Sequence, residues 1–440
     1  MSTAVVLFTQ DLRLHDNPAL HAARTRADQV VPLFVLDPAI ARAGFAAPNR
    51  QAFLADSLAD LDRALRAAGS RLILRHGDPA EQVARLAAEC GAATVHATAG
   101  VSAFATRREH VLRRVLGERL HLHDAALTVV PPGLVTPAGR DHYAVFTPYH
   151  RAWQQVPRRT VLPAPRALST PDHPASAPLP TAPAGTSPGL PPGGESAARR
   201  RLRAWDPDAY DRLHDDLAAD ATSRLSPYLH FGCLSAVELA HRAAESGAPG
   251  AAALVRQLAW RDFHHQVLAA RPDAAHADYR PRPHRWYDDE RELRAWCEGR
   301  TGYPIVDAGM RQLAHEGWMH NRARLLAASF LTKSLRHHWR TGAAHFLALL
   351  VDGDIADNQL NWQWVAGTGT DTRPGRVLNP LRQAERHDPD GAYVRRWVPE
   401  LAHLPARAVH RPWELAERPA GYPAPLLPPG ALAARLRDTG

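Results

Sequence analysis

The sequence has 440 residues, enough for two or three domains, and its 45% hydrophobic and 22% charged content is that of a globular protein. It has no apolar run long enough for a membrane span, and residues 1–10 lack the layout of a signal peptide. Three scattered cysteines exclude a disulfide scaffold and a cysteine-based zinc module, and they favour a reducing cytoplasm. The net charge of +8 is compatible with a nucleic-acid partner.

Short apolar runs alternate with helical periodicity in the first part of the chain. We expect strands at 4–9, 30–36, 70–77, 94–98 and 120–124, separated by helices at 16–26, 49–68, 79–90 and 104–116. This alternation predicts right-handed crossovers and a doubly wound parallel sheet. The segment after the first strand, TQDLRLHDNPAL, lacks the glycines of a dinucleotide-binding loop, which argues against a Rossmann dehydrogenase.

A proline-rich segment separates this part from the rest of the chain. Eleven prolines lie between residues 157 and 192, a composition that predicts an exposed, partly extended linker. Long helical periodicities follow and indicate an all-α domain. The predicted domains are an α/β domain at 1–130, a linker at 131–195 and a helical domain at 196–440.

Two segments carry polar groups on helices, and each has a structural and a ligand-binding interpretation. In TSRLSPYLHFG, Thr222 or Ser223 can cap a helix, but clustered hydroxyls at a helix start also suit a phosphate. In RQLAWRDFHHQ, Gln257 and Trp260 share one helical face. They fit either a hydrogen-bonded core or the wall of a pocket for a flat polar ligand.

A third polar group lies on a longer helical stretch. In GWMHNRARLL, the residues Asn321, Arg324 and Leu325 fall on one helical face, which suggests a lined cavity. Asp352 and Asp354 follow in a glycine-containing segment. These carboxylates can bind a cation, but the further oxygen ligands expected for one are absent. Alternatively, Asp352 fixes Arg324 beside a planar ligand; we predict no metal.

Six motifs together resemble those of the DNA photolyase/cryptochrome family: TSRLSPYL, WRDF, EGRTGYPIVDAGMRQL, GWMHNR, DGDIADNQLNWQW and DPDGAYVRRWVPEL. They stand in family order and at family spacing, and the opening FTQDLRLHDNPAL is similar to the family's amino-terminal segment. The chain most resembles the class I members, which repair cyclobutane pyrimidine dimers. The resemblance implies an α/β antenna domain followed by an all-α domain that binds FAD.

The same resemblance implies a mechanism and a cofactor site. Photoexcited reduced FAD donates one electron to a cyclobutane pyrimidine dimer, the two intradimer bonds break, and the electron returns. Arg324, paired with Asp352, is implied to lie beside the isoalloxazine. Asn358 matches the residue facing flavin N5, where family members that repair DNA tend to carry Asn. The residues implied to bind FAD are Tyr210, Thr222, Ser223, Arg224, Leu225, Ser226, Arg324, Asp352, Asp354 and Asn358.

UV-damaged DNA is the implied partner, with the lesion flipped into a pocket that has aromatic walls. The implied contacts to lesion and DNA are Gln257, Trp260, Asn321, Arg322, Leu325, Trp364 and Arg376, with the two arginines at the flanking phosphates. Trp286, Trp339 and Trp362 match the family's electron-transfer chain from the surface to the flavin. Three core aromatics are the alternative interpretation of these tryptophans.

Two departures from the family pattern bear on the lesion. Gln257 stands where dimer-repairing members usually carry Glu; an amide donates and accepts hydrogen bonds but cannot share an acidic proton. Leu325 replaces the usual Met at similar volume. A (6-4) photoproduct enzyme is expected to carry histidines at Asn321 and Leu325, so cyclobutane dimers are the predicted substrate.

The resemblance also bears on a second chromophore and on an alternative function. Relatives with a deazaflavin or folate antenna place acidic or amide ligands where this chain has Gly100 and Ser102, although Arg50 is retained, so a second chromophore is left open. The alternative function is a cryptochrome-like blue-light photoreceptor without repair activity. No long tail follows Leu401, which favours repair. We expect a monomeric cytoplasmic protein.

Overall fold

The computed structural model describes residues 1–437 except 125 and 374, and its contacts divide the chain into two compact units. Unit 1 contains residues 1–186, 191–208 and 223–272. Unit 2 contains residues 187–190 and 209–222 together with everything from Asp273 onward. The segment 223–272, which sequence analysis assigned to the helical domain, thus clusters with the sheet.

Unit 1 is built on a five-stranded parallel sheet in the order β3-β2-β1-β4-β5. Each predicted strand is present, with its ends shifted by at most a few residues. The strands are β1 (Thr3–Phe8), β2 (Gln29–Leu36), β3 (Ile73–His76), β4 (Thr94–Thr98) and β5 (Leu120–His123). The order places the first strand at the centre, as in a doubly wound sheet, and the predicted fold class is confirmed.

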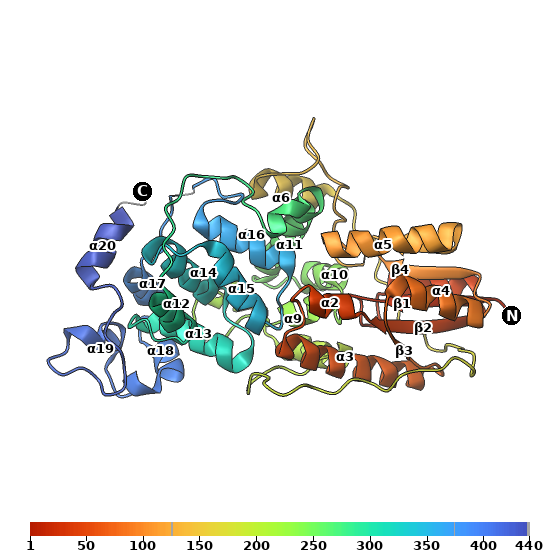
Figure 1. Ribbon diagram of the computed structural model, residues 1–440, viewed down its shortest axis with the longest axis horizontal. Coiled ribbons are helices and arrows are strands. Elements are labelled where there is room, and N and C mark those ends of the chain that lie inside the picture. The colour runs from red at the N-terminus through yellow and green to blue at the C-terminus, as the bar shows by residue number, and fades with distance from the viewer. Residues whose placement is uncertain (125, 374, 438–440) are drawn as a thin grey trace. The chain divides into compact units, whose positions relative to one another are not determined.

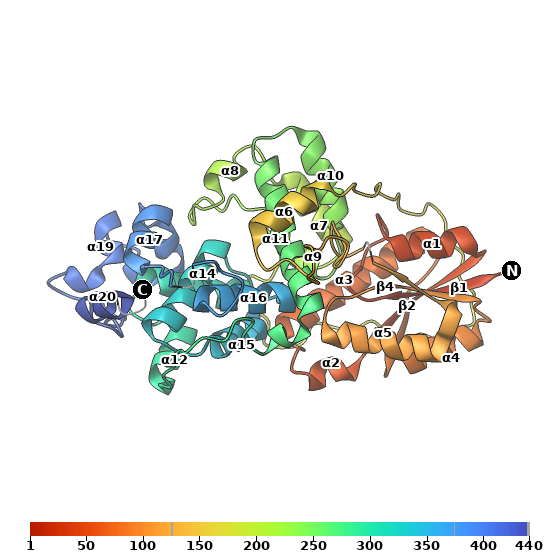
Figure 2. The same ribbon diagram turned by 90° about the horizontal axis from the view of Figure 1, so that it is seen from above.

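Helices cover both faces of this sheet. Figure 2 shows α1 on one face and α4 and α5 on the other. Alternate strand residues such as Leu7 and Leu33 form one hydrophobic core with Val83 of α4 and Leu112 of α5. The helices of unit 1 are α1 (Pro18–Arg26), α2 (Pro38–Arg42), α3 (Pro48–Ala67), α4 (Pro79–Glu89), α5 (Ala103–Leu116), α6 (Phe146–Gln155), α7 (Glu195–Ala204), α9 (Ser226–His230), α10 (Ala236–Ser246) and α11 (Ala251–Ala270).

The proline-rich segment contains no helix or strand over 157–192, as its composition predicted. It is nevertheless tied to the sheet rather than loosely exposed. The N–H of Ala177 donates to the carbonyl of Leu74 in β3 at 2.8 Å, and Ser176 Oγ accepts from the N–H of Leu74 at 2.9 Å. Because β3 is an edge strand, these bonds occupy backbone groups that would otherwise be open to pairing.

Two of the motif residues have structural roles in unit 1. Arg13, from the opening motif, is 1% exposed and donates to the backbone carbonyls of Asp16, Ala126 and Gly232 at 2.9–3.2 Å. Asp262, from WRDF, is equally buried, and its carboxylate accepts from the indole N–H of Trp153 and from two backbone N–H groups at 2.9 Å. Burial raises the pKa of Asp262 to about 6. Through these hydrogen bonds, each of the two side chains links separate segments of unit 1.

Gly232 offers a stability prediction for this packing. It lies at φ +65°, and a Cβ there would be 1.8 Å from the carbonyl oxygen of Gln10, a backbone atom that cannot rotate away. We expect Gly232→Ala to lower the free energy of unfolding by more than the roughly 1–3 kcal/mol of left-handed strain alone. Gly247→Ala is the matched control, because Gly247 has a similar φ of +62° and no heavy atom within 4 Å of the added Cβ. Chemical denaturation of both variants measures the difference; equal losses would contradict the packing argument.

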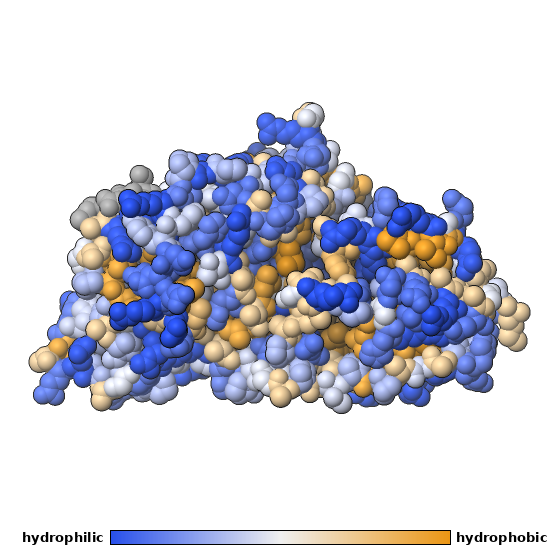
Figure 3. All heavy atoms as spheres, in the orientation of Figure 1, coloured by the Kyte–Doolittle hydropathy of each residue, from blue (hydrophilic) through white to orange (hydrophobic). Residues whose placement is uncertain are grey.

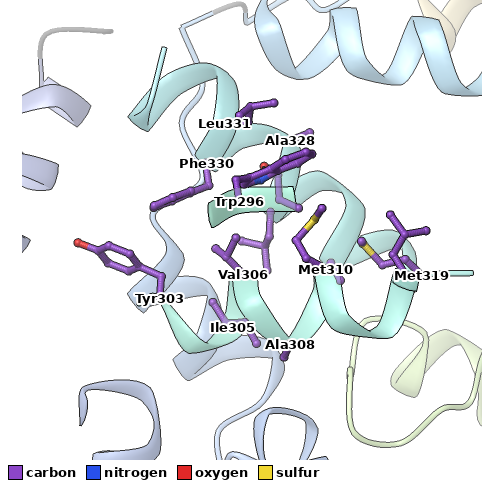
Figure 4. Packing of buried hydrophobic residues seen from close by; sticks show 14 of the residues in the cluster. Trp296, Tyr303, Ile305, Val306, Ala308, Met310, Met319, Ala328, Phe330 and Leu331 are labelled. Carbon is purple, nitrogen blue, oxygen red and sulfur yellow. The ribbon is translucent and has the colours of Figure 1, made fainter. Parts of the chain in front are cut away.

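Unit 2 is helical. Its helices are α8 (Tyr210–Leu213), α12 (Glu290–Cys297), α13 (Pro304–Glu316), α14 (Asn321–Ser329), α15 (Trp339–Leu349), α16 (Ile355–Ala366), α17 (Pro380–His387), α18 (Ala392–Trp397), α19 (Ala406–His410) and α20 (Pro429–Arg437), with a π-helical turn at Phe330–Ser334. Trp296 lies at the centre of the core, among Met310, Ala328 and Leu331 (Figure 4). Among the described residues, no helix is long and apolar enough to cross a membrane.

Candidate functional site

An ion pair joins two of the predicted site residues in unit 2. Arg324 Nη2 lies 2.8 Å from one carboxylate oxygen of Asp352 and 3.1 Å from the other, and Arg324 Nε donates to the carbonyl of Met319 at 2.8 Å. The Asp352 side chain is 3% exposed and that of Arg324 is 24% exposed. The expected pairing is therefore present, with a guanidinium held at a fixed place on α14.

The other two predicted polar residues, Asp354 and Asn358, lie at the start of helix α16, just after Asp352 in the sequence. Asp354 caps its amino terminus and accepts from the N–H of Asp357 at 3.1 Å. One turn on, Asn358 is 7% exposed and donates from Nδ2 to the carbonyl of Ala343 in α15 at 3.2 Å. Helices α14 and α15 both pack against α16 (Figures 1 and 2). These contacts fix the positions of both side chains.

His320 is a candidate that sequence analysis missed. It caps α14, where its Nδ1 accepts from the N–H of Arg322 at 3.1 Å, so its proton lies on Nε2. That Nε2 is buried and has no hydrogen-bond partner among the described residues. Burial lowers the pKa of His320 to about 4 and keeps the ring neutral, although Asp215 opposes the shift. Only the folded structure reveals this donor, because the sequence signal is merely a histidine before a helix.

The donor set of unit 2 fits a flavin. An unpartnered buried N–H is costly unless a ligand accepts from it, and the isoalloxazine has several oxygen and nitrogen acceptors. The charge of the Arg324 guanidinium acts on the His320 ring. Both side chains are hydrogen-bond donors. Tyr210, the first residue of α8, is 7% exposed, and burial raises its pKa to about 12, which keeps its hydroxyl protonated.

The segment predicted to hold phosphates has an unusual backbone. Arg224 lies at φ +52°, a left-handed conformation that is uncommon for a residue with a Cβ. The expectation that Thr222 or Ser223 caps the following helix is wrong: α9 begins at Ser226 after Leu225, without a side-chain cap. Instead, Ser223 Oγ accepts from the N–H of Leu225 at 3.4 Å. The helix starts two residues after this left-handed turn, so neither Thr222 nor Ser223 stands at the N-cap position.

Helix α11 of unit 1 carries Gln257 and Trp260, which were predicted to form either a core or a pocket wall. Gln257 is exposed, so it is not a hydrogen-bonded core residue. Trp260, one turn along, is half-buried and stacks on Phe146 of α6, with ring centroids 3.7 Å apart and an interplanar angle of 4°. The guanidinium of Arg256 lies 4.9 Å from the Phe146 ring. This stacking fixes the plane of the Trp260 indole.

The remaining predicted DNA contacts lie in unit 2. Asn321 is exposed at the start of α14, and Leu325 is half-buried one turn later. The guanidinium of Arg376 lies 5.7 Å from the ring of Trp364. Arg322, by contrast, forms two hydrogen bonds of 2.6 Å with the Asp215 carboxylate. The structure therefore pairs Trp364 with Arg376 and shows that Arg322 already has an anionic partner.

The three predicted electron-transfer tryptophans lie around α15. Trp339, its first residue, is fully buried. The ring of His338 contacts both Trp339 and the half-buried Trp286, with centroid distances of 5.9 and 5.0 Å. Trp362, from α16, packs so closely on α15 that a Cβ at Gly342 would be 2.2 Å from its ring. Trp362 and Trp286 thus lie near the same end of one helix in unit 2.

The expected antenna positions are occupied by structural contacts. The N–H of Gly100 donates to the buried Glu109 carboxylate at 2.7 Å, and a side chain at Gly100 would collide with Ala105. Ser102 caps α5 by accepting from the N–H of Ala105 at 3.2 Å. Arg50 is buried and donates to the carbonyl of Phe45. A carboxylate is therefore present at this place, but its hydrogen bond is to the backbone.

Comparison with known proteins places this geometry in context. Residues 4–169 match the family model described as DNA photolyase, and residues 254–435 match that of the FAD binding domain of DNA photolyase. A deoxyribodipyrimidine photo-lyase of Streptomyces griseus is 62% identical over 424 residues, covering 94% of this chain and 93% of the relative.

Two solved structures share the fold over the whole chain. A bacterial class III photolyase from Agrobacterium tumefaciens superposes with a TM-score of 0.93 and 32% identity, covering 100% of this chain and 97% of that one. A cryptochrome from Synechocystis superposes with a TM-score of 0.91 and 28% identity, covering 100% and 99%. The fold is thus shared by a photolyase and by a cryptochrome.

Proposed function

This chain belongs to the DNA photolyase family, and on that premise we propose that it repairs cyclobutane pyrimidine dimers in DNA with light and reduced FAD. The observation that carries the proposal is the Streptomyces griseus relative, a deoxyribodipyrimidine photo-lyase that is similar over nearly the full length of both chains. The FAD-binding domain expected from the motifs is present. The protein is therefore a lyase that acts in DNA repair, as the motifs predicted.

FAD, when bound and reduced, supplies an electron that light makes available. The chain's own residues bind and orient the ring system. Arg324, held by Asp352, places a positive charge beside it, and His320 contributes the N–H that is otherwise unpartnered. Asn358, fixed by α15, is proposed to face N5. The further residues proposed to bind FAD are Tyr210, Thr222, Ser223, Arg224, Leu225, Ser226 and Asp354.

Lesion recognition is proposed to use exposed polar and aromatic groups. On α11, Gln257 donates to and accepts from the damaged bases, and the fixed indole of Trp260 gives them a flat apolar surface. In unit 2, Asn321, Leu325 and Trp364 are proposed to contact the same lesion.

Phosphate contacts are proposed for two arginines. Arg376, exposed beside Trp364, is placed to bind a flanking phosphate. Arg322 first has to exchange the Asp215 carboxylate for a phosphate, so we expect it to contribute less.

We propose a route by which electrons from solution reduce the oxidised cofactor, consisting of Trp286, Trp339 and Trp362.

The lesion proposal predicts a separable effect at Gln257. Gln257→Ala is expected to weaken binding to dimer-containing DNA more than binding to undamaged DNA, because the phosphate contacts are unchanged. Gln257→Glu is expected to keep or raise dimer affinity, since a charged hydrogen bond contributes roughly 1.5–3 kcal/mol against about 1 for a neutral one. Both affinities are measured in the dark at one salt concentration.

Arg376→Ala is the matched control, and it should weaken binding to damaged and undamaged DNA by similar factors. The assignment of Gln257 is contradicted if Gln257→Ala lowers both affinities equally or lowers neither.

A blue-light photoreceptor is the second candidate, because the Synechocystis cryptochrome shares the fold. Asn358 favours repair, since photoreceptors of the resembled family often carry Asp or Cys there. A photoreceptor without repair activity would leave dimers intact when the reduced protein is illuminated.

Three further features are part of the proposal. A second, light-harvesting chromophore, if one is bound, is proposed to contact the segment around Gly100. The protein is proposed to act as a monomer. On the face seen in Figure 3, hydrophilic residues prevail and apolar side chains lie in separate patches. It is proposed to be cytoplasmic, because its three cysteines are free thiols, as in a reducing compartment.

A further inference from the structure

Trp339, the middle tryptophan of the proposed electron route, has an ionisable partner. Its side chain is fully buried, and its indole N–H donates to the Asp278 carboxylate at 2.7 Å. Trp296, an equally buried tryptophan of the same core, donates instead to the backbone carbonyl of Ala327 at 3.0 Å. A neutral acceptor is sufficient for an indole that only fills a core. Trp153 of unit 1 also donates to a carboxylate, that of Asp262, which joins segments of that unit. Trp339 differs because its carboxylate partner contacts a member of the proposed electron route.

Helix α16, which also carries Trp362, holds Asp278 in place. The amide of Gln363 is fully buried; it accepts from the N–H of Tyr279 at 2.7 Å and donates to two carbonyls just before Asp278 at 2.7 and 3.1 Å. One turn earlier, Gln359 donates to a third carbonyl of the same segment at 2.7 Å. The loop that supplies the carboxylate is therefore positioned by the helix that supplies the first tryptophan.

The two histidine rings that interact with Asp278 do not offset its charge. His284 and His338 both interact electrostatically with it, and burial lowers the pKa of each ring. His338 Nδ1 also accepts from the N–H of Arg340 at 3.1 Å, which places its single proton on Nε2. Both rings are therefore neutral near pH 7, and the negative charge of Asp278 acts on the Trp339 indole.

We propose that Asp278 stabilises oxidised Trp339 and takes up its indole proton. Once Trp362 is oxidised, one electron moves from Trp339 to Trp362 and the N1–H proton of Trp339 passes to Asp278. A neutral tryptophan radical then stands beside a neutral carboxylic acid. One electron from Trp286, itself re-reduced by a thiol in solution, and the returning proton restore the starting state. The proposal rests on the proposed function, which supplies the oxidation of Trp362.

The physical basis is the change in acidity that oxidation causes. Indole itself does not release its N–H proton at neutral pH, whereas an indole that has lost an electron is about as acidic as a carboxylic acid. At 2.7 Å the proton crosses an existing hydrogen bond, so no heavy atom has to move far. Removing the charge of Asp278 should shorten the lifetime of the separated charges by roughly ten- to a hundredfold, the range expected for a hydrogen bond to a charged group.

Three variants test the proposal in the FAD-bound protein. Asp278→Asn keeps the shape and an acceptor oxygen but removes the charge and the proton acceptor; Asp278→Glu keeps both on a longer arm. After a light flash on oxidised protein, transient absorption distinguishes a neutral tryptophan radical from the cation. We expect the neutral radical in the unaltered protein and its recovery in Asp278→Glu. In Asp278→Asn we expect a radical cation that does not lose its proton and that recombines sooner. Trp296→Phe is the control and should leave the signal unchanged.

Two further measurements supplement the variants: one is made in the dark without photochemistry, and the other uses only the unaltered protein. In the dark, the indole ¹⁵N–¹H resonance of Trp339, assigned as the one missing from Trp339→Phe, should move upfield in Asp278→Asn as its hydrogen bond weakens. In the unaltered protein, conversion of the cation to the neutral radical should slow in D₂O.

The outcomes distinguish a failure of the role of Asp278 from a failure of the electron route. A neutral radical formed at the normal rate in Asp278→Asn, or a conversion insensitive to D₂O, overturns the role of Asp278 and leaves the electron route standing. Normal photoreduction in Trp339→Phe overturns the route itself, and the role of Asp278 falls with it.

Discussion

Replacing Trp339 with phenylalanine should abolish light-driven reduction of oxidised FAD while leaving repair by chemically reduced protein intact. Trp339 is fully buried beside Gly342, over which the ring of Trp362 packs, and the ring of His338 contacts both Trp339 and Trp286. A phenyl ring is much harder to oxidise than an indole, so the route from the surface loses its middle step. Repair starts from reduced cofactor and does not use this route. The measurements are the absorbance of the flavin under light with a thiol present, and dimer loss after reduction with dithionite.

The matched control is Trp296→Phe. Trp296 is as buried as Trp339, and its ring is 6.0 Å from that of Trp362, but its indole donates to a backbone carbonyl. We expect this variant to keep photoreduction despite a similar loss of core packing. If Trp339→Phe loses both photoreduction and repair, Trp339 is structural and the electron route is wrong.

Asp352→Ala should release FAD. The change leaves Arg324 without its carboxylate partner in a largely buried place, and the loss of one member of a buried pair typically costs about 3–5 kcal/mol. Arg324 retains some contact with solvent, so we expect the lower part of that range, and a rise in the Kd for FAD of at least about tenfold. The measurement is the ratio of bound flavin to protein after extensive dialysis, together with the Kd from flavin fluorescence.

Glu400→Ala is the control for this prediction. It breaks another ion pair of unit 2, between Arg311 and Glu400 at 2.7 Å, in which both side chains are similarly exposed, at 20% and 26%. That variant should keep its flavin. Full FAD occupancy in Asp352→Ala would contradict the assignment of the Arg324–Asp352 pair to the cofactor.

The sheet could be predicted from the sequence because its signal is local. Each strand is a short apolar run bounded by polar residues, and each helix between strands has three- and four-residue spacing, so both periods are visible without tertiary information. The helix α2 was missed because five residues are too few to show a period. The proline-rich segment was correctly predicted to lack helix and strand, but its hydrogen bonds to β3 depend on an edge that only the assembled sheet creates.

The site was predictable where motif residues meet one another, as in the pairing of Arg324 with Asp352. Capping by Thr222 or Ser223 was wrong because the turn at Arg224 displaces the helix start, a backbone effect that residue preferences do not contain. The contact between Asp278 and Trp339 joins residues 61 positions apart and belongs to no periodic pattern. The buried Nε2 of His320 was likewise invisible, since burial of a single atom depends on every segment packed around it.

The proposed repair of cyclobutane dimers is tested most directly by illuminating the FAD-bound, chemically reduced protein with UV-damaged oligothymidine. Restored thymine bases absorb in the ultraviolet where dimers do not, so repair is followed as recovery of that absorbance, with an identical sample kept in the dark. We predict recovery in the light over many turnovers per protein molecule and none in the dark. Unchanged absorbance in the illuminated sample, from protein that retains reduced FAD and binds the damaged DNA, would contradict the proposed function.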